Sequence, residues 1–268
     1  TLFVSKTRLA AQHLCYTHPG SDWTLSVPEF ALPPSQFRAI LGPNGSGKST
    51  FLRLLAGILT PQEGEIWINQ QRLSSISRRD LACSLAYLPS ETRNEFDFTV
   101  QEIVSMGRYA HLGRGGFMKA ADFDAVRRAM EITDVTPFHA RRLSHLSAGE
   151  RQRTFLASIL AQDPEMILLD EPTNALDMHH QVKLFHILND LAHRGISVLM
   201  VLHDMNMASL YCDQISFFQA GRIVREGTPD KVLQPEFLAQ VYEEPVLLLK
   251  HPLTHRPLLF PHGQGGEA

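Results

Sequence analysis

Nine consecutive residues, Gly42 to Thr50, carry the clearest chemical pattern: GPNGSGKST matches the spacing G-x-x-x-x-G-K-[ST] in full. Glycines here let backbone N–H groups turn toward phosphate oxygens, and Lys48 can reach the β- and γ-phosphates. Ser49 offers a hydroxyl to Mg²⁺, and the start of the following helix adds positive potential. The pattern predicts a nucleoside triphosphate site rather than an ordinary glycine-rich turn. We expect its contacts to come from Gly42, Pro43, Asn44, Gly45, Ser46, Gly47, Lys48, Ser49 and Thr50.

Two acidic residues at the end of an apolar run complete this chemistry. The segment MILLDEP places Asp170 and Glu171 at the tip of a predicted buried strand. Two buried acids are costly without a cation or a proton. We expect Asp170 to hold Mg²⁺ through water and Glu171 to polarise the attacking water as general base.

The next apolar run, ISVLMVLHD, ends near His203. A histidine at such a strand tip can reach a γ-phosphate and orient the transition state. A histidine satisfied within the core is the alternative, which the neighbouring strand ends disfavour. The expected catalytic residues are therefore Glu171, His203 and Lys48.

A second segment with anion-binding character, LSAGERQR, covers residues 146–153. Its serine, glycine and glutamate mark a helix start, where free backbone N–H groups favour an anion. The complete phosphate loop lies far earlier in the chain. The sequence therefore raises the question of whose phosphate this second helix start binds.

The hydrophobic pattern predicts the elements that position these residues. FRAIL, residues 37–41, predicts a strand ending at the glycine loop, and the residues after the loop have helical spacing. The apolar runs at 166–170 and 196–204 suit parallel strands covered on both faces. A helix predicted over residues 178–195 joins them into a βαβ unit. GEIWI and SLAYL are two further strand candidates.

Residues 91–146 differ, because they contain amphipathic helix candidates without a strand between them. We expect an α/β fold: a P-loop NTPase (RecA-like) core with a mostly parallel sheet, an N-terminal antiparallel β subdomain and a helical insertion. A hairpin around Ala220 and Gly221 and a short appendage follow, and HGQGGEA at the end is expected to be disordered. The predicted divisions are 1–90 for the β subdomain and first part of the core, 91–146 for the helical subdomain, 147–220 for the second part of the core and 221–268 for a C-terminal β/α appendage.

The bulk composition narrows the function classes. A chain of 268 residues with a net charge of −3 has no basic footprint for nucleic acid. It contains no apolar run of about 18 residues to span a membrane, and its N-terminal stretch does not read as a signal peptide. Cys15, Cys83 and Cys212 lack CxxC spacing, which favours reduced thiols over a disulfide or zinc site.

Three histidines, at positions 179, 186 and 193, recur every seven residues on a predicted helix. They share one face, but a rise of about 10 Å per step separates them too far to share one metal. The spacing favours a solvated or interface stripe.

The order of these motifs resembles the ATP-binding cassette (ABC) ATPases: Walker A, helical insertion, signature, Walker B, D-loop and H-switch. The resemblance implies ATP and Mg²⁺ as ligands. It also implies that Ser147 and Gly149 of one copy contact the γ-phosphate held by a second copy. Tyr16 fits the aromatic residue that stacks on adenine, with an ordinary strand tyrosine as the alternative. The D-loop would comprise residues 174–177.

Several further segments look like the ATPase subunits of type II importers, which serve iron–siderophore, haem and cobalamin permeases. These are MGRYAHLG, LDMHHQ, HDMNMASLYCD, GRIVREGTPDKVL and RPLLFP. The resemblance implies a homodimer at the cytoplasmic face of the membrane, bound to transmembrane permease subunits that dock near residues 90–120. A substrate-binding protein would take part indirectly, and no nucleic acid is expected. The cargo is not recorded in such a subunit.

Two positions depart from the family pattern. Ser90 stands where the Q-loop glutamine is expected, and we assign it to the metal site with Glu91 or a water as a substitute for the longer side chain. Ala148 stands where the signature has glycine, while Gly149 is retained. The departures leave nucleotide binding in place but affect the expected metal coordination.

Two other classes compete with the transport ATPase. A soluble ABC protein acting on DNA or ribosomes would carry a long coiled-coil insertion, a second cassette or basic extensions. A P-loop kinase for a small molecule would leave LSAGE and NALD unexplained. A nucleic-acid-stimulated ATPase rate would support the first, and a phosphorylated acceptor the second.

Overall fold

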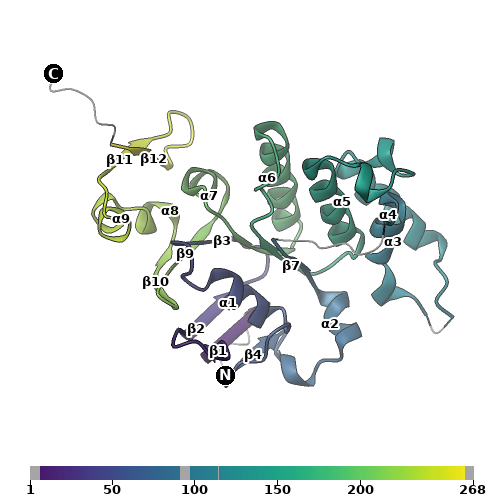
Figure 1. The fold of residues 1–268 in the computed structure, drawn as a ribbon, viewed down its shortest axis with the longest axis horizontal. Coiled ribbons are helices and arrows are strands. Elements are labelled where there is room, and N and C mark those ends of the chain that lie inside the picture. The colour runs from purple at the N-terminus through teal and green to yellow at the C-terminus, as the bar shows by residue number, and fades with distance from the viewer. Residues whose placement is uncertain (1–6, 91–96, 114, 263–268) are drawn as a thin grey trace.

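The computed structural model describes residues 7–90, 97–113 and 115–262. Two sheets form its centre (Figure 1). The first has the order β2-β1-β4-β5 and is antiparallel, as predicted for the N-terminal region. Its strands are β1 (Leu9–Thr17), β2 (Thr24–Leu32), β4 (Glu63–Ile68) and β5 (Gln71–Arg72).

The second sheet has six strands in the order β10-β9-β3-β8-β7-β6. Every neighbouring pair is parallel except β9 and β10, which form the predicted antiparallel hairpin. The mostly parallel sheet of the predicted core is therefore confirmed. Its strands are β3 (Phe37–Leu41), β6 (Leu85–Leu88), β7 (Met166–Asp170), β8 (Ser197–Val201), β9 (Gln214–Gln219) and β10 (Arg222–Gly227).

Both faces of the central strands are buried, which explains their nearly continuous apolar sequences. On β7, Ile167 and Leu169 pack in the cluster that contains α6 (Met178–His193), while Leu168 packs on the other face with α1 (Lys48–Leu55). The register pairs Asp170 with Val201, so β7 and β8 end together at one edge of the sheet. This edge carries the residues predicted to be catalytic.

A helical layer with its own core lies beside the sheets (Figure 1). It contains α3 (Val100–Met106), α4 (Ala120–Ile132) and α5 (Ala148–Ala161), and no strand occurs among the described part of residues 91–146. The layer thus continues past residue 146, because α5 packs against both α3 and α4. A buried ion pair joins the three helices: Arg108 Nε lies 2.9 Å from Asp122 Oδ1, and Arg108 also donates to Ala161 O.

The remaining helices are short. They are α2 (Arg78–Ser84), α7 (Met205–Tyr211), α8 (Pro229–Val232) and α9 (Pro235–Tyr242), with 3₁₀ turns at Leu73–Ser75, Tyr109–His111, Thr136–Phe138 and Leu143–His145. A C-terminal hairpin of β11 (Val246–Lys250) and β12 (Pro257–Pro261) completes the appendage. The expected disorder of HGQGGEA falls almost entirely outside the described residues.

The histidine stripe is exposed on α6, as the spacing predicted for positions 179, 186 and 193. The three cysteines are free. None of the helices in the described ranges has both the length and the apolar character needed to cross a membrane.

Candidate nucleotide-binding site

The phosphate loop, residues 42–50, connects β3 to α1 and depends on glycine at two positions. Gly42 has φ 141°, and a Cβ there would lie 2.0 Å from the backbone oxygen of Phe218. Gly47 has φ 101°, and a Cβ there would lie 2.7 Å from the ring of Trp23. A larger residue at either position would be strained and would also collide with a neighbour. The loop geometry confirms the predicted strand–loop–helix arrangement.

Lys48 begins α1, and its side chain folds back over the loop. Its Nζ donates to the carbonyl oxygens of Gly42 and Pro43, at 2.9 Å each. Burial lowers the pKa of the Lys48 ammonium, against the opposing effect of Glu171 and Asp170. The ammonium is therefore held at the loop by two carbonyl oxygens, within the electrostatic influence of two carboxylates.

A cavity of about 250 Å³ opens above the loop. The predicted residues Gly42, Pro43 and Ser46 shape the loop without lining this cavity. The lining residues are His18, Trp23, Asn44, Gly45, Gly47, Lys48, Ser49, Thr50 and Glu171.

Ser49 and Asp170 meet at the floor of the site. Ser49 Oγ donates to Asp170 Oδ1 at 2.9 Å. The other carboxylate oxygen, Oδ2, is buried and has no hydrogen-bond partner among the described residues. Burial raises the pKa of Asp170, and Glu171 raises it further. A hydroxyl beside a buried, unpartnered carboxylate oxygen fits the oxygen ligands that Mg²⁺ takes together with substrate phosphates.

Glu171 follows directly and lies in a different environment. Its φ of 51° is in the left-handed region, which a non-glycine residue adopts at a cost that often marks functional sites. His203 Nε2 lies 2.7 Å from Glu171 Oε1, and Asn174 donates to Glu171 Oε2 at 2.6 Å. The structure therefore brings both predicted catalytic residues of the strand ends together and adds Asn174 to them.

Ser90 lies apart from this group. It is exposed, follows the end of β6 at the sheet edge, and is not among the residues that line the cavity. Its expected substitute Glu91 falls outside the described residues. The assignment of Ser90 to the metal site stays a prediction.

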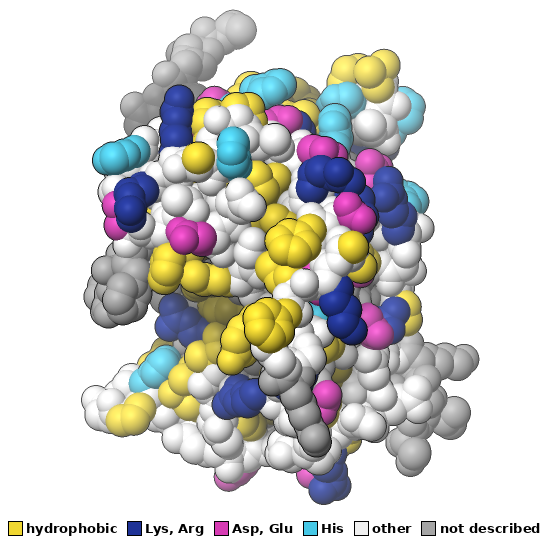
Figure 2. All heavy atoms as spheres, turned by 90° about the vertical axis from the view of Figure 1, so that its right-hand side faces the viewer, with side chains coloured by type: hydrophobic (Ala, Val, Ile, Leu, Met, Phe, Trp, Pro, Cys, Tyr) yellow, Lys and Arg dark blue, Asp and Glu magenta, His cyan; other side chains and the backbone are white. Residues whose placement is uncertain are grey.

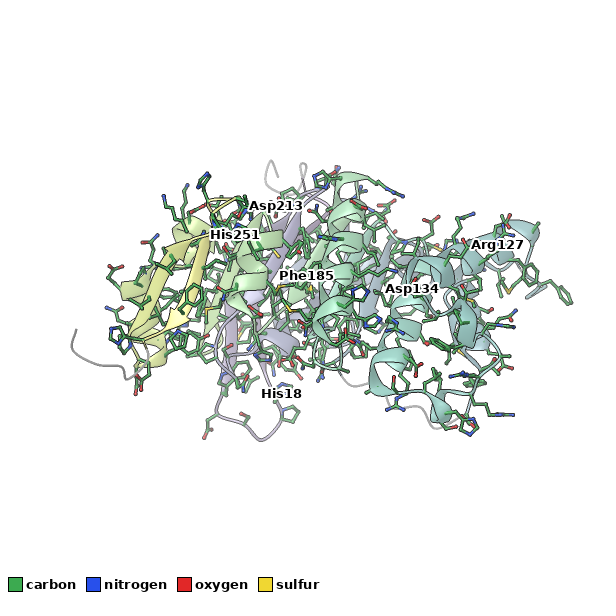
Figure 3. All side chains as sticks on the ribbon, turned by 90° about the horizontal axis from the view of Figure 1, so that it is seen from above. His18, Arg127, Asp134, Phe185, Asp213 and His251 are labelled. Carbon is green, nitrogen blue, oxygen red and sulfur yellow. The ribbon has the colours of Figure 1, made fainter. Side chains whose placement is uncertain are left out.

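Tyr16, predicted to stack on adenine, is also not among the lining residues. Its side chain packs in the core beside β2, with 9% of the residue exposed. Its hydroxyl lies 3.3 Å from His18 Nδ1, and His18 Nε2 lies 3.2 Å from Thr50 Oγ1. His18 stands in the loop after β1 (Figure 3), and its ring is stacked with that of Trp23 at 6.3 Å.

His18 and Trp23 were not predicted from the sequence. They lie in the irregular segment HPGSD and just after it, where neither periodicity nor motif spacing places a side chain. The available signal was that both are aromatic and close to a predicted base-stacking residue. The structure shows that they are the aromatic side chains at the cavity.

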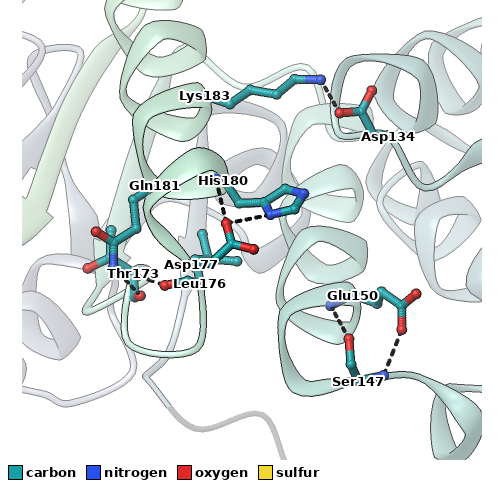
Figure 4. Close-up of polar contacts among 9 residues, drawn as sticks. All are labelled: Asp134, Ser147, Glu150, Thr173, Leu176, Asp177, His180, Gln181 and Lys183. Carbon is teal, nitrogen blue, oxygen red and sulfur yellow. Dashed lines mark hydrogen bonds and ion pairs between the residues drawn. The ribbon is translucent and has the colours of Figure 1, made fainter.

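The signature segment starts α5 with a reciprocal cap (Figure 4). Ser147 Oγ accepts from Glu150 N at 3.3 Å, and Glu150 accepts from Ser147 N at 2.7 Å. These contacts lower the pKa of Glu150. Neither Ser147 nor Gly149 lines the cavity of its own chain, and Ala148 is exposed beside them. The predicted helix start is confirmed, while its contact with a phosphate stays a prediction.

The D-loop connects the end of β7 to α6 (Figure 4). Asp177 Oδ1 caps α6 by accepting from His180 N at 2.9 Å and lies 2.8 Å from His180 Nδ1. Gln181 donates to the carbonyl oxygens of Thr173 and Leu176. The loop also approaches the signature closely, since a Cβ on Gly149 would lie 3.2 Å from Ala175 O.

The fold and the site define a P-loop ATPase with a helical layer. Its site combines a phosphate loop with a carboxylate suited to a metal ion and a glutamate–histidine pair, and a capped helix start lies apart from them. Comparison with known protein families identifies the family of this chain. Residues 25–174 match the profile described as ABC transporter. The chain therefore belongs to the ABC transporter family, and it is the ATP-binding ATPase component.

The most similar relatives include transport proteins for iron compounds. The chain is 35% identical to the ferric enterobactin transport ATP-binding protein FepC of Escherichia coli K12, over 87% of this chain and 86% of that protein. It is 37% identical to the hemin import ATP-binding protein HmuV of Escherichia coli O157:H7, covering 94% and 98%. A solved chain assigned to a metal-chelate type ABC transporter, in an inward-facing conformation, superposes with a TM-score of 0.82 at 26% identity, covering 96% and 98%.

Proposed function

We propose that this chain is the ATP-hydrolysing subunit of an importer for an iron chelate or haem, with cobalamin as a related cargo. Two copies would hold two Mg·ATP between them. One observation carries the dimer: the signature helix start is well formed, yet neither Ser147 nor Gly149 lines the cavity at the phosphate loop of the same chain. A second copy supplies what each chain lacks.

The side chains suggest how hydrolysis proceeds. The phosphate loop and Lys48 hold the phosphates, and Ser49 and Asp170 would hold Mg²⁺, which neutralises charge on the phosphate oxygens. Glu171 takes the proton of the attacking water as general base. His203 Nε2 lies 2.7 Å from Glu171 Oε1, so His203 can orient that carboxylate, and we assign it the contact with the γ-phosphate. Tyr16 would support the binding site for the adenine ring through its contact with His18.

The helical layer offers a surface for the permease. A groove of about 690 Å³ is lined by side chains that include Phe98, Met106 and Tyr109. Figure 2 looks onto this layer and shows hydrophobic side chains in a band across the face. Tyr109 is 80% exposed and Met106 is 46% exposed. A large exposed apolar surface marks an interaction site, so we assign this groove to the transmembrane subunits.

The ferric enterobactin transport by FepC and hemin import by HmuV support an iron-linked cargo, and the similar structure of a metal-chelate type transporter agrees with it. We extend the assignment to a position at the cytoplasmic face of the membrane, with a substrate-binding protein acting through the permease. The alternative, a soluble ABC ATPase acting on nucleic acid or ribosomes, has less support because the net charge is −3.

The experiment that tests the proposal is Glu171→Gln. Loss of the base should reduce the ATPase rate by at least about a hundredfold, while ATP binding persists and an ATP-bound dimer accumulates. Steady-state hydrolysis and size-exclusion chromatography with light scattering measure the two effects. The control is Asn189→Ala, which replaces a half-buried residue on α6. A parent-like rate in Glu171→Gln would show that Glu171 is not the base.

A further inference from the structure

Two segments of the chain that the ATPase chemistry does not use lie against each other. One is α7, residues 205–211, which begins two positions after His203. The other is β12, residues 257–261, in the C-terminal hairpin. The two pack together although about fifty positions separate them in sequence (Figure 1). The hairpin thus reaches the helix that follows the catalytic strand end.

Asn206 makes the most specific of these contacts. Its Nδ2 donates to the carbonyl oxygen of Leu259 at 3.1 Å, and its Oδ1 accepts from Leu259 N at 2.7 Å. The side-chain amide therefore pairs with both backbone groups of one strand residue, as a neighbouring strand would. Two reciprocal bonds define the orientation of the amide, because an amide has one acceptor and one donor group.

Further bonds hold the other end of α7. The buried Ser209 donates from Oγ to Pro257 O at 2.6 Å. Arg256 donates to the carbonyl oxygens of Ser209 and Cys212 at 2.8 and 2.6 Å, where the last turn leaves such groups without helix partners. A helix of seven residues is marginal by itself. Core packing of Ala208 and the bonds from the hairpin together fix its position.

The start of α7 is continuous with the catalytic histidine. Asp204 caps the helix by accepting from Asn206 N at 2.8 Å and Met207 N at 3.0 Å. The preceding residue in the chain before Asp204 is His203, whose side chain is 43% exposed and contacts Glu171. Few contacts of its own hold this side chain in place. His203 lies between the end of β8 and the start of α7, so a shift of α7 would displace its side chain.

We propose that Asn206 is a positioning residue for His203. The β11–β12 hairpin supports His203 by holding Asn206 in place. This inference rests on the proposed function, in which His203 acts at the γ-phosphate. The hairpin lies outside the phosphate loop and outside the signature, so it affects the rate of hydrolysis rather than the binding of ATP. The segments HDMNMASLYCD and RPLLFP, which resemble those of type II importer subunits, act together in this proposal.

The test uses Asn206→Ala in the full-length chain. We expect kcat for ATP hydrolysis to fall about tenfold, because small displacements of a catalytic group are costly. KM and the dissociation constant for ATP, measured with a fluorescent ATP analogue, should stay within about twofold. The matched control is Asn189→Ala on α6, which should keep the parent kcat.

A second variant attacks the same contact from the hairpin. Leu259→Pro removes the N–H that bonds to Asn206 while Asn206 stays intact. Positions 257 and 261, which point their backbone groups to the same edge as 259, are already proline. The substitution therefore suits the strand, and it should lower kcat with little change in KM.

The double variant Asn206→Ala with His203→Ala separates positioning from general structure. If Asn206 acts through His203, it causes no further loss when His203 is absent. An equal loss in both backgrounds, a parent-like kcat in Asn206→Ala, or an ATP affinity that falls as much as kcat would overturn the inference. Parent-like hydrolysis by His203→Ala alone would instead overturn the proposed role of the histidine.

Discussion

At the scale of residues, the two adjacent acids at the end of β7 have opposite surroundings. Asp170 is fully buried, one of its oxygens has no partner within the described part of the chain, and burial raises its pKa. Both oxygens of Glu171 are bonded, one by His203 and one by Asn174. A cation beside Asp170 would favour its charged form. These environments support the proposal that the first acid binds the metal and the second transfers the proton.

The aromatic side chains at the cavity give the first prediction. Trp23→Ala should weaken ATP binding by about 5- to 150-fold if its ring stacks on the base, the range that base–aromatic stacking supplies. The measurement is a titration of the Trp67→Phe protein, in which Trp23 is the remaining tryptophan and its emission should change with ATP.

Tyr16→Phe is the control for this prediction. It keeps the buried ring and removes only the hydroxyl that contacts His18, so ATP affinity should change by less than about threefold. If Trp23→Ala binds ATP as tightly as the parent and the emission of Trp67→Phe stays constant with ATP, Trp23 does not stack on the adenine base. The stacking role would then belong to Tyr16, as predicted from the sequence.

The residue types of the site could be predicted from the sequence because motif spacing fixes them. GPNGSGKST and MILLDEP each sit at a strand end, so their side chains had to meet at one sheet edge. His18 and Trp23 could not be predicted, because the loop that carries them has no periodicity. The Glu171–His203 contact also depends on side-chain rotamers, which spacing does not specify.

At the scale of elements, the helical layer contains a buried ion pair beside its apolar core. Arg108 and Asp122 have side chains that are about nine-tenths buried, and Asp122 also accepts from Lys119 N at 2.9 Å. That backbone bond, followed by the bond from Arg108, lowers the pKa of Asp122. A single carboxylate thus caps α4 and ties it to α3 and α5.

The second prediction concerns this carboxylate. Asp122→Asn should destabilise the protein by about 3 kcal/mol at pH 7, because it leaves the guanidinium without its charge partner. A lowered folded-state pKa contributes stability above the unfolded value of about 3.9 and loses it as the pH falls through the folded pKa. The difference in the free energy of unfolding between variant and parent should therefore become smaller below about pH 4.

Urea unfolding followed by circular dichroism from pH 7 down to pH 3 measures this gap. Asp124→Asn is the control, since Asp124 forms an exposed ion pair with Arg127 on the same helix. It should change stability by less than about 1 kcal/mol at every pH. A gap for Asp122→Asn that stays constant with pH would contradict the assignment.

The extent of this layer was harder to predict than its existence. Amphipathic spacing showed helices between residues 91 and 146, and the structure confirms them. The packing of α5 on α3 and α4 was not visible, because α5 also faces the core cluster under β7. A helix with two packed faces gives no single stripe that assigns it to one layer.

At the scale of the whole molecule, the two halves of the proposed phosphate clamp lie at separate places in the chain. The phosphate loop starts α1, and the signature starts α5 in the helical layer. Both are intact, and the D-loop lies within contact distance of the signature start. A two-fold pair of chains would satisfy both halves at once, which is the closed arrangement expected of a symmetric dimer.

The last prediction tests this arrangement in the Glu171→Gln background, where the ATP-bound dimer should accumulate. Adding Ser147→Arg places a long cation at the exposed helix start and should abolish the dimer, while the monomer still binds ATP through its own phosphate loop. Light scattering measures the mass, and nucleotide titration measures the affinity. Ser147→Ala removes only the cap, at a cost of about 1 kcal/mol, and should weaken the dimer less. Ser75→Arg, an exposed serine in the turn before α2, should leave it unchanged. An ATP-bound dimer that persists in Ser147→Arg would mean that this helix start binds no phosphate, and that the ATPase does not work as a clamp of two copies.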